Sequence, residues 1–446
     1  MGRRFFAAVA LALVVCGPAS AAVAHAKSAL DDPLQAQEWW LTAVGADITQ
    51  APGPGVPITI VDSGTDPTHP EFAGRPNTTF LNDQTVIGPE EYHGTIVASV
   101  AAAPENGVGI VGVYPNAALQ LYDASPTPQG IVDLAAVDGI LTAAEHCPGV
   151  INLSFGGSQP DDSMHEAILT AVRHGCLVVA AAGNSGESGS PVTYPAAWPH
   201  VFTVAATDQS GNVASFSTNS PAVDIAAPGV SITGAVPLSR DPSGYQSNLS
   251  GTSFSAPIVA AAAAWVWTLR PTLTASQIAG VLRSSAHDIG PPGFDNASGW
   301  GLLNIPGALT AAPPAVDPDE PNDDIDEIKP GDLFQAGEPP LTSVQQPNGK
   351  ISASLDSAED PIDVYRIWVP AHRTVRVKVT SGGTAAARIW GPKTIAMDEF
   401  LAARRRDLRG QSITATKKGF AAYVEVLLTG SSSSARYTLS VKASRH

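Results

Sequence analysis

Short apolar runs alternate with stretches of helical periodicity along the first two thirds of the chain. Apolar runs at 56–61, 119–122 and 150–153 predict buried strands, and residues 94–102 and 134–146 predict helices. Strands that alternate with helices form βαβ units, in which a parallel sheet carries helices on both faces. The pattern therefore predicts an α/β domain, with its chemistry in the loops at the carboxyl ends of the strands.

Polar capping residues mark two of the helix starts. Thr274 and Gln277 have the spacing of a capping box at the start of a helix. Asp161 and Asp162 supply caps and favourable charge for a helix over 164–174. Both signals agree with the α/β pattern.

The pattern changes after residue 310. Residues 311–318 are small and proline-rich, which is typical of a linker. Apolar and polar residues alternate further on, as at 374–379 and 437–441, between glycine and serine turns. We therefore expect an α/β domain over 27–310, this linker, and a small all-β sandwich over 319–446.

The composition is that of a globular protein, and the acidity is concentrated in the first domain. The chain has 446 residues, 44% hydrophobic and 15% charged, and a formal net charge of −16. Residues 27–310 hold six Lys and Arg against 24 Asp and Glu, whereas the remainder is balanced. An acidic surface repels phosphate backbones, so nucleic acid is not an expected partner.

The first 26 residues predict export. A basic start at 3–4 precedes an apolar stretch at 5–16 and a small-residue cleavage pattern at 24–26, with 19–21 as an alternative cleavage site. The two arginines leave the twin-arginine route open. The longest later apolar run, 258–269, is too short to span a bilayer. We therefore expect a signal peptide over residues 1–26 and a mature protein that is secreted, soluble and monomeric.

Cleavage after residue 26 would leave two cysteines, Cys147 and Cys176. Each stands just before an apolar run that predicts a buried parallel strand, at 150–153 and 177–182. If these strands are neighbours, the sulfurs meet, and an oxidising compartment favours a disulfide. The alternative is two small buried residues that never meet.

Four polar residues follow apolar runs among glycines and small residues: Asp62, His93, Asn184 and Ser253. A serine hydroxyl needs a base to become nucleophilic, and imidazole titrates near neutrality. Asp62 would orient His93, and His93 would accept the proton of Ser253. Asn184 would donate to an oxyanion. The set predicts nucleophilic acyl transfer.

Each of these residues alone has an ordinary structural explanation. An aspartate at a strand end is commonly a cap, a His-Gly pair is commonly a turn, and Gly-Thr-Ser occurs in many loops. Their occurrence together, in the order Asp, His, Asn, Ser within one α/β domain, favours the chemical interpretation.

At these positions the chain resembles the subtilases, the subtilisin-like serine peptidases. Four segments carry the resemblance, in the family's order: 61–64 (VDSG), 93–95 (HGT), 182–184 (AGN) and 251–257 (GTSFSAP). The resemblance implies a subtilisin-like fold and a secreted serine endopeptidase with an Asp62–His93–Ser253 triad. The chain departs from the family pattern at Ile96 and Ile258, where histidines are common.

The resemblance also implies a cleft for protein or peptide substrates. Ser154, Phe155 and Gly156 match the family segment that pairs with the substrate as an extra β-strand and walls the P1 pocket. Ala181, Ala182 and Gly183 match the opposite wall. In such binding, main-chain hydrogen bonds give affinity and side-chain pockets give selectivity.

Calcium is the cofactor that the resemblance implies, for structure rather than chemistry. Asp32, Glu71 and Asn106 would hold it together with backbone carbonyls of the loop 104–108. Glu71 stands where the family usually has aspartate. The alternative is a solvated loop with ordinary surface acids. The ten histidines are scattered, which gives no support for a transition metal.

The second domain resembles the bacterial pre-peptidase C-terminal domain. The matching segments are 319–323 (DEPND), 360–366 (DPIDVYR) and 435–439 (ARYTL). The acidic opening at 319–323 is expected to be a solvated loop, with cation binding as the alternative.

Two other functions stay open. One is a catalytically weak subtilase-fold module that binds peptides or a surface, which loss of any of the four polar residues would have favoured. The other is a processing peptidase for one partner. About 30 residues separate the expected cleavage site from the first catalytic strand, too few for a folded inhibitory prosegment.

Overall fold

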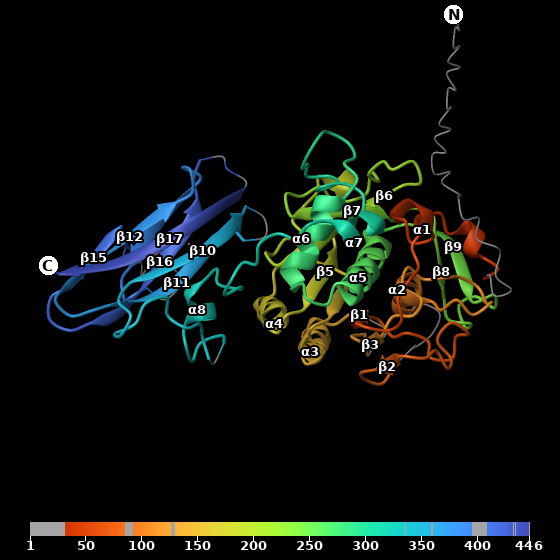
Figure 1. Cartoon of the computed structure of the whole chain (residues 1–446). Coiled ribbons are helices and arrows are strands. Elements are labelled where there is room, and N and C mark those ends of the chain that lie inside the picture. Colours follow the sequence, from red (N-terminus) through yellow and green to blue (C-terminus); the bar gives the residue numbers. More distant parts are fainter. Residues whose placement is uncertain are drawn as a thin grey trace, which may run out of the picture.

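The computed structural model describes residues 32–84, 92–125, 130–334, 336–357, 360–394, 408–430, 432 and 434–445. The expected signal peptide lies outside these residues. An α/β domain comes first along the chain, and a domain of β-strands follows it (Figure 1).

Parallel strands form the sheet at the centre of the first domain. Their order is β2-β3-β1-β4-β5-β6-β7. The strands are β1 (Ile58–Asp62), β2 (Thr78–Phe80), β3 (Leu119–Asp123), β4 (Val150–Leu153), β5 (Leu177–Ala181), β6 (Val201–Thr207) and β7 (Val223–Pro228). All residues of β1, β4, β5, β6 and β7 are buried, since helices cover both faces. The continuous apolar runs in the sequence follow from this burial.

Helices pack on the two faces of the sheet and form two separate cores. They are α1 (Trp39–Val44), α2 (His93–Ala102), α5 (Thr252–Leu269), α6 (Ala275–Ser285) and α7 (Ile305–Thr310) on one face, and α3 (Asp133–Ala144) and α4 (Asp162–Arg173) on the other. The capping box of Thr274 and Gln277 is present, and Asp161 caps α4. The predicted fold class is confirmed.

Helix α5 is longer than the apolar run in the sequence suggested. Its 18 residues are apolar enough to cross a bilayer by length and composition alone. However, 83% of the helix is buried inside the α/β domain, where it packs beside α2 and the sheet. The helix is apolar because it is buried in the core of the domain. The sequence analysis had instead argued against a membrane span from the shortness of the apolar run.

A hairpin of β8 (Ile232–Ala235) and β9 (Tyr245–Leu249) packs beside α2. Ser99 on α2 accepts a hydrogen bond from the backbone N–H of Ala235, with N and Oγ 2.9 Å apart. Ile96, one of the two departures from the subtilase pattern, is fully buried against Gly234 of this hairpin. At this position the chain therefore uses apolar packing.

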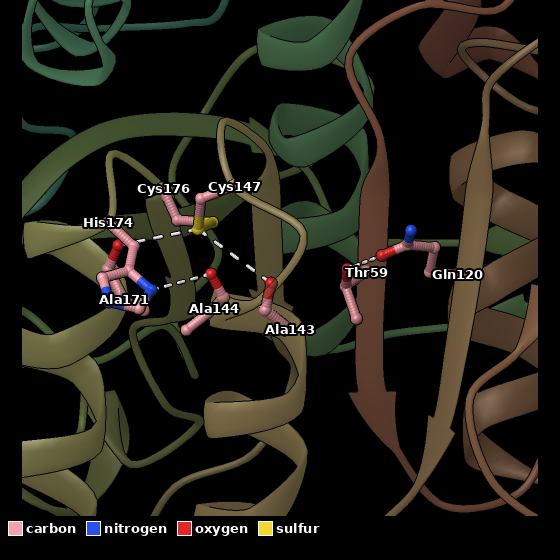
Figure 2. Close-up of a disulfide and its surroundings, with 8 residues drawn as sticks. All are labelled: Thr59, Gln120, Ala143, Ala144, Cys147, Ala171, His174 and Cys176. Carbon is pink, nitrogen blue, oxygen red and sulfur yellow. Dashed lines mark hydrogen bonds between the residues drawn. A yellow bond between two sulfur atoms is a disulfide. The ribbon is translucent and has the colours of Figure 1, made fainter.

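Cys147 and Cys176 form a disulfide in the structure, with their Cα atoms 5.2 Å apart. They lie just before β4 and β5, which are neighbours with Val150 opposite Leu177. Figure 2 shows the sulfurs above the end of α3, near His174. Adjacent parallel strands thus bring together two residues that are 29 positions apart.

The second domain consists of two antiparallel sheets packed face to face, with the strand orders β10-β17-β12-β15 and β11-β16-β13-β14. Their bounds are β10 (Gly349–Asp356), β11 (Ile362–Val369), β12 (Arg373–Thr380), β13 (Ala385–Trp390), β14 (Leu408–Gly410), β15 (Ser412–Ala415), β16 (Phe420–Leu428) and β17 (Ser434–Arg445). Side chains from both sheets form one core. The predicted sandwich is confirmed.

The segment between the domains contacts the first of them. Between Thr310 and Gly349, the described residues contain one short helix, α8 (Ile325–Ile328). Gln277 on α6 donates to the carbonyl of Pro314, with N and O 2.9 Å apart. In Figure 1 the sandwich lies on the side of the first domain where α4 and α6 are found.

Candidate active site

Asp62 and His93 lie in contact where β1 ends and α2 begins. Asp62 is fully buried, and its Oδ1 lies 2.7 Å from His93 Nδ1. The next residue, Gly94, allows this approach, because a Cβ atom there would lie 1.8 Å from the carbonyl oxygen of Ser63. The backbone N–H of Gly94 donates to Ser63 Oγ at 2.9 Å. The first turn of α2 is therefore held against the turn that follows Asp62.

The aspartate controls the charge of the histidine. Burial lowers the pKa of His93, but the negative charge and hydrogen bond of Asp62 outweigh burial, so the pKa is raised above its ordinary value of 6.5. About a third of the His93 side chain, 34%, is exposed. The ring is therefore accessible from the cleft while its Nδ1 edge is held by Asp62.

Ser253 lies in the first turn of α5, and its hydroxyl points toward β4. Its Oγ donates to the carbonyl of Ser154 at 2.9 Å, and Ser154 Oγ donates in return to the carbonyl of Ser253 at 2.8 Å. The sequence predicts a hydrogen bond from the Ser253 hydroxyl to His93, whereas in this structure the hydroxyl donates to the backbone carbonyl of Ser154. The two reciprocal bonds hold the start of α5 against the end of β4.

Asn184 follows β5, and Thr252 fixes the orientation of its amide. Asn184 Oδ1 accepts hydrogen bonds from the backbone N of Thr252 at 2.9 Å and from its Oγ1 at 3.0 Å. Thr252 Oγ1 in turn accepts from the backbone N of Gly183 at 3.1 Å. Because Oδ1 is engaged, the NH₂ end of the amide is left to donate. The sequence analysis gave Thr252 no role, although it stands in the segment 251–257.

These residues line one cleft of about 670 Å³. Asp62, His93, Asn184 and Ser253 share it with the expected substrate residues Ser154, Phe155, Gly156 and Gly183. Ala182 is the exception among the expected residues. It packs into a small core with Ala205, Val223 and Ala226. Its neighbours Ala181 and Gly183, which the resemblance also implied, do line the cleft, because side-chain direction alternates along this strand-like segment.

Thr193 stands between the two walls of the cleft, and the sequence analysis did not identify it. A Cβ atom at Gly156 would lie 2.9 Å from Thr193 Cγ2, and one at Gly183 would lie 3.0 Å from Thr193 Oγ1. Thr193 therefore fills the space that the two glycines leave. The only signal in the sequence is that both walls carry glycine.

Asp32, Glu71 and Asn106 come together as the resemblance implied. Asp32 Oδ1 accepts from the backbone N of Val108 at 2.7 Å, and Asn106 Nδ2 lies 3.4 Å from Glu71 Oε2. Glu38, which the sequence analysis missed, is a third buried acid beside them. Burial and the neighbouring carboxylates raise the pKa of Glu38 to about 9 and that of Glu71 to about 7.

The same residues offer oxygen atoms to a cation. Within the described ranges, Asp32 Oδ2 is buried and has no hydrogen-bond partner. The charge of Asp32 raises the pKa of both Glu38 and Glu71, and a positive charge placed among these carboxylates would stabilise them. Oxygen ligands of this kind suit a hard cation. The donor set therefore fits calcium.

The structure contradicts two expectations, one about the acidic opening of the second domain and one about the histidines. Residues 319–323 do not form a solvated loop, because Asn322 is fully buried and only 15% of the Glu320 side chain is exposed. His200 lies near other potential metal ligands, because Glu320 and Asp323 are beside it. Packing of one domain against the other brings these residues together.

The chain is similar to known peptidases over its first domain. The model of the subtilase family matches residues 53–301. Subtilisin DY of Bacillus licheniformis is 35% identical over 279 residues, which are 61% of this chain and 99% of that protein. An alkaline protease of Alkalihalobacillus alcalophilus is 37% identical over 259 residues, which are 57% of this chain and 64% of that protein.

A solved structure gives the same result for the fold. The psychrophilic subtilisin-like protease Apa1 from the Antarctic psychrotroph Pseudoalteromonas sp. AS-11 matches with a TM-score of 0.53 and 21% identity, covering 61% of this chain and 96% of that one. The family match, in contrast, extends over more than half of the chain. The chain thus belongs to the subtilase family of serine-type endopeptidases.

Proposed function

We propose that this protein is a secreted endopeptidase that hydrolyses peptide bonds through a triad of Asp62, His93 and Ser253. The observation that carries the proposal is the 2.7 Å contact between Asp62 Oδ1 and His93 Nδ1, in a cleft that Ser253 also lines. An oriented imidazole beside a serine is the arrangement that acyl transfer needs.

Substrate binding prepares the nucleophile. A peptide that pairs with the segment 154–156 places its P1 N–H at the carbonyl of Ser154, the oxygen that holds Ser253 Oγ in the free protein. The displaced hydroxyl then turns to His93, which accepts its proton as Oγ attacks the scissile carbonyl carbon. Asp62 stabilises the imidazolium that forms.

The amide of Asn184 stabilises the oxyanion. Its free NH₂ end and the backbone N–H of Ser253 donate to the carbonyl oxygen as it gains negative charge. Collapse of the intermediate breaks the C–N bond, and His93 gives its proton to the leaving amine. Water then hydrolyses the acyl-enzyme by the same steps, with His93 as the base.

The P1 pocket is expected to accept small side chains. Thr193 stands between Gly156 and Gly183, so it closes the space between the two walls. Apart from Asp62 and His93, the lining of the cleft contains no Asp, Glu, His, Lys or Arg in the part of the chain that the structure describes. Small uncharged P1 residues are therefore the proposed substrates.

Calcium is proposed as a structural cofactor. Asp32, Glu71 and Asn106 would hold it, and Glu38 stands beside them. The ion would offset the repulsion of buried carboxylates and tie the loop 104–108 to the N-terminal segment. No catalytic step depends on it.

The remaining parts of the chain are proposed on sequence grounds. Residues 1–26 act as a signal peptide, 27–310 form the peptidase domain and 311–318 link it to the second domain. Residues 319–446 correspond to a pre-peptidase C-terminal domain, and the antiparallel sandwich supports this assignment.

One observation favours the second candidate, a catalytically weak peptide-binding module. The Ser253 hydroxyl is given to Ser154 rather than to His93. A serine that never reached its base would leave a cleft that binds peptides without cleaving them. Both candidates share the cleft, so a direct measurement of serine reactivity separates them.

A fluorophosphonate probe tests the proposal. We expect the purified mature protein to be labelled on Ser253, as mapped by mass spectrometry, and the Ser253→Ala variant to lose both label and turnover. Ser250→Ala is the matched control, since Ser250 is an exposed serine of the adjacent loop and its variant should be labelled normally. Folded protein without label on Ser253 would favour the binding module.

Labelling with and without a calcium chelator tests the cofactor. Loss of label on chelation, with recovery on added calcium, is expected if the ion supports the fold. The Asp32→Asn variant should label poorly at low calcium and recover only at higher calcium. Equal labelling and equal thermal stability in both conditions would exclude the structural ion.

A further inference from the structure

Carboxylates of the linker and of the second domain gather near His200 of the first domain. They form two overlapping groups, whose ligand atoms lie within 4.8 Å of one another in each group. One group contains Asp317, Glu320 and Asp363, and the other contains Glu320 and Asp323 with His200 of the peptidase domain. We call these residues the junction cluster. Glu320 belongs to both groups and lies at its centre.

His200 reaches the cluster from the other domain. It stands immediately before β6, and only 10% of its side chain is exposed. Its Nε2 lies 3.2 Å from Asp323 Oδ2 and 3.8 Å from Glu320 Oε2. Over the described residues, Nε2 has no hydrogen-bond partner. A buried imidazole nitrogen is thus aimed at two carboxylates across the domain boundary.

Over the described ranges, several polar atoms of the junction cluster and of its neighbours along the chain are buried without a hydrogen-bond partner. Among the residues that the structure describes, these atoms lack a hydrogen-bond partner: both Oε atoms of Glu320, Oδ1 of Asp317, Asp323 and Asp360, and both amide atoms of Asn322. Such groups are costly unless a positive charge or a proton joins them.

We propose that the junction cluster binds a divalent metal ion, with His200, Glu320 and Asp323 among its ligands, so that the ion joins the two domains. One imidazole with two carboxylates suits zinc or manganese, whereas the all-oxygen group of Asp317, Glu320 and Asp363 suits calcium. The ligand chemistry is therefore that of a divalent cation. The histidine is the feature that makes the site depend on both domains.

An ion at this position fixes the second domain to the face of the first that carries α4 and α6 (Figure 1). At the same junction, Arg173 on α4 forms an ion pair with Glu338. Both partners of that pair are mostly buried, but it involves one contact between two flexible side chains. A metal ion with ligands from both domains would hold them more rigidly and make their arrangement sensitive to chelators.

The test counts ions on the full-length mature protein that carries Ser253→Ala to prevent self-digestion. Chelated protein is equilibrated separately with zinc, manganese and calcium, and bound metal is measured by mass spectrometry and calorimetry. The His200→Ala variant is expected to bind one ion fewer, or to bind it at least about tenfold more weakly. The Glu320→Gln variant should behave in the same way. Asp32→Asn separates the proposed N-terminal calcium site from this one.

His146→Ala is the matched control, because His146 is an exposed histidine of the same domain and should leave metal binding unchanged. If His200→Ala fails to fold, as judged by circular dichroism, His200→Gln replaces it. The second readout is cleavage of the linker 311–318 by an added protease. Metal should slow this cleavage in the control and not in the His200 variant.

Two outcomes would overturn the proposal. Equal affinity of the His200 variant and the control would mean that the ion lies on the all-oxygen group of Asp317, Glu320 and Asp363 and not on His200. Absence of any ion beyond the N-terminal site would mean that His200 and Asp323 form an ordinary ion pair.

Discussion

Replacing Thr252 by valine should slow the chemical step through Asn184. The hydroxyl of Thr252 donates to Asn184 Oδ1 at 3.0 Å and accepts from the backbone N of Gly183 at 3.1 Å. Valine has nearly the same shape as threonine and removes both bonds. The backbone N of Thr252, 2.9 Å from Asn184 Oδ1, remains in place. The amide therefore keeps one of its two anchors.

The expected decrease in kcat follows from the number of hydrogen bonds that anchor the Asn184 amide. One neutral hydrogen bond contributes about 1 kcal/mol, and that amount corresponds to roughly a fivefold change in rate. Complete loss of an oxyanion donor costs about 3–4 kcal/mol of transition-state stabilisation. We therefore expect kcat to fall about fivefold to tenfold in Thr252→Val and by a factor of about 10²–10³ in Asn184→Ala. KM should stay nearly constant, because the oxyanion exists only in the transition state.

The assay is a double-mutant cycle with a peptide substrate. In the Asn184→Ala background, Thr252→Val should change kcat very little, because the residue through which Thr252 acts is gone. Thr252→Ser keeps the hydroxyl and should restore most of the activity. Thermal unfolding of each variant separates loss of function from loss of fold. If Thr252→Val slowed the reaction equally in both backgrounds, Thr252 would not act by orienting Asn184.

Other predictions concern the triad, the P1 pocket and the disulfide. Asp62→Asn should lower kcat by about 10⁴, because His93 loses its orientation. His93 must be neutral to accept a proton, so kcat/KM of the wild type should rise with pH through a midpoint above 6.5. This midpoint should move to lower pH in Asp62→Asn, because the charge of Asp62 raises the pKa of His93. An unchanged midpoint would contradict the assigned pKa shift. Thr193→Gly should raise the ratio of kcat/KM for phenylalanine over alanine at P1 by about tenfold or more, and a constant ratio would show that Thr193 does not limit the pocket. Replacing Cys147 and Cys176 by alanine opens a loop of 29 residues. The free energy of unfolding, measured by denaturant titration, should fall by about 3–4 kcal/mol, and a loss below about 1 kcal/mol would refute the loop-closure argument.

Much of the fold and the centre of the site follow from local sequence patterns. Strands buried on both faces give continuous apolar runs, so β1, β4 and β5 could be placed within one or two residues. Asp62 and Asn184 follow two of these strands, and parallel strands end at the same edge of a sheet. Their convergence was therefore predictable before any contact was known.

Contacts between distant segments could not be predicted in this way. The bonds from Thr252 to Asn184 and from Ser253 to Ser154 join residues 68 and 99 positions apart, and no local pattern encodes them. Ala182 shows the opposite error, since a family motif gives the position but not the face of the chain to which the side chain points. In each of these cases side-chain direction, and not secondary structure, determines the contact.

The acidic opening of the second domain illustrates a further limit. Charged residues between a proline-rich linker and a first strand are usually exposed, so the sequence favoured a solvated loop. Glu320 and Asp323 are mostly buried, and His200 of the first domain lies against both of them. Burial that depends on a second domain leaves no trace in the hydrophobic pattern of the segment itself.

The bond from Ser253 to Ser154 does not make the enzyme inactive by itself. A hydrogen bond of this kind contributes about 0.5–1.5 kcal/mol, so it lowers the population of hydroxyls that face His93 by roughly tenfold at most. That factor is small beside the loss of about 10⁴ that follows removal of the aspartate from such a triad. A substrate that takes the Ser154 carbonyl removes even this small penalty. A catalytically weak module would therefore require a larger defect than the orientation of one hydroxyl, such as a displaced His93, and the 2.7 Å contact between His93 and Asp62 is intact.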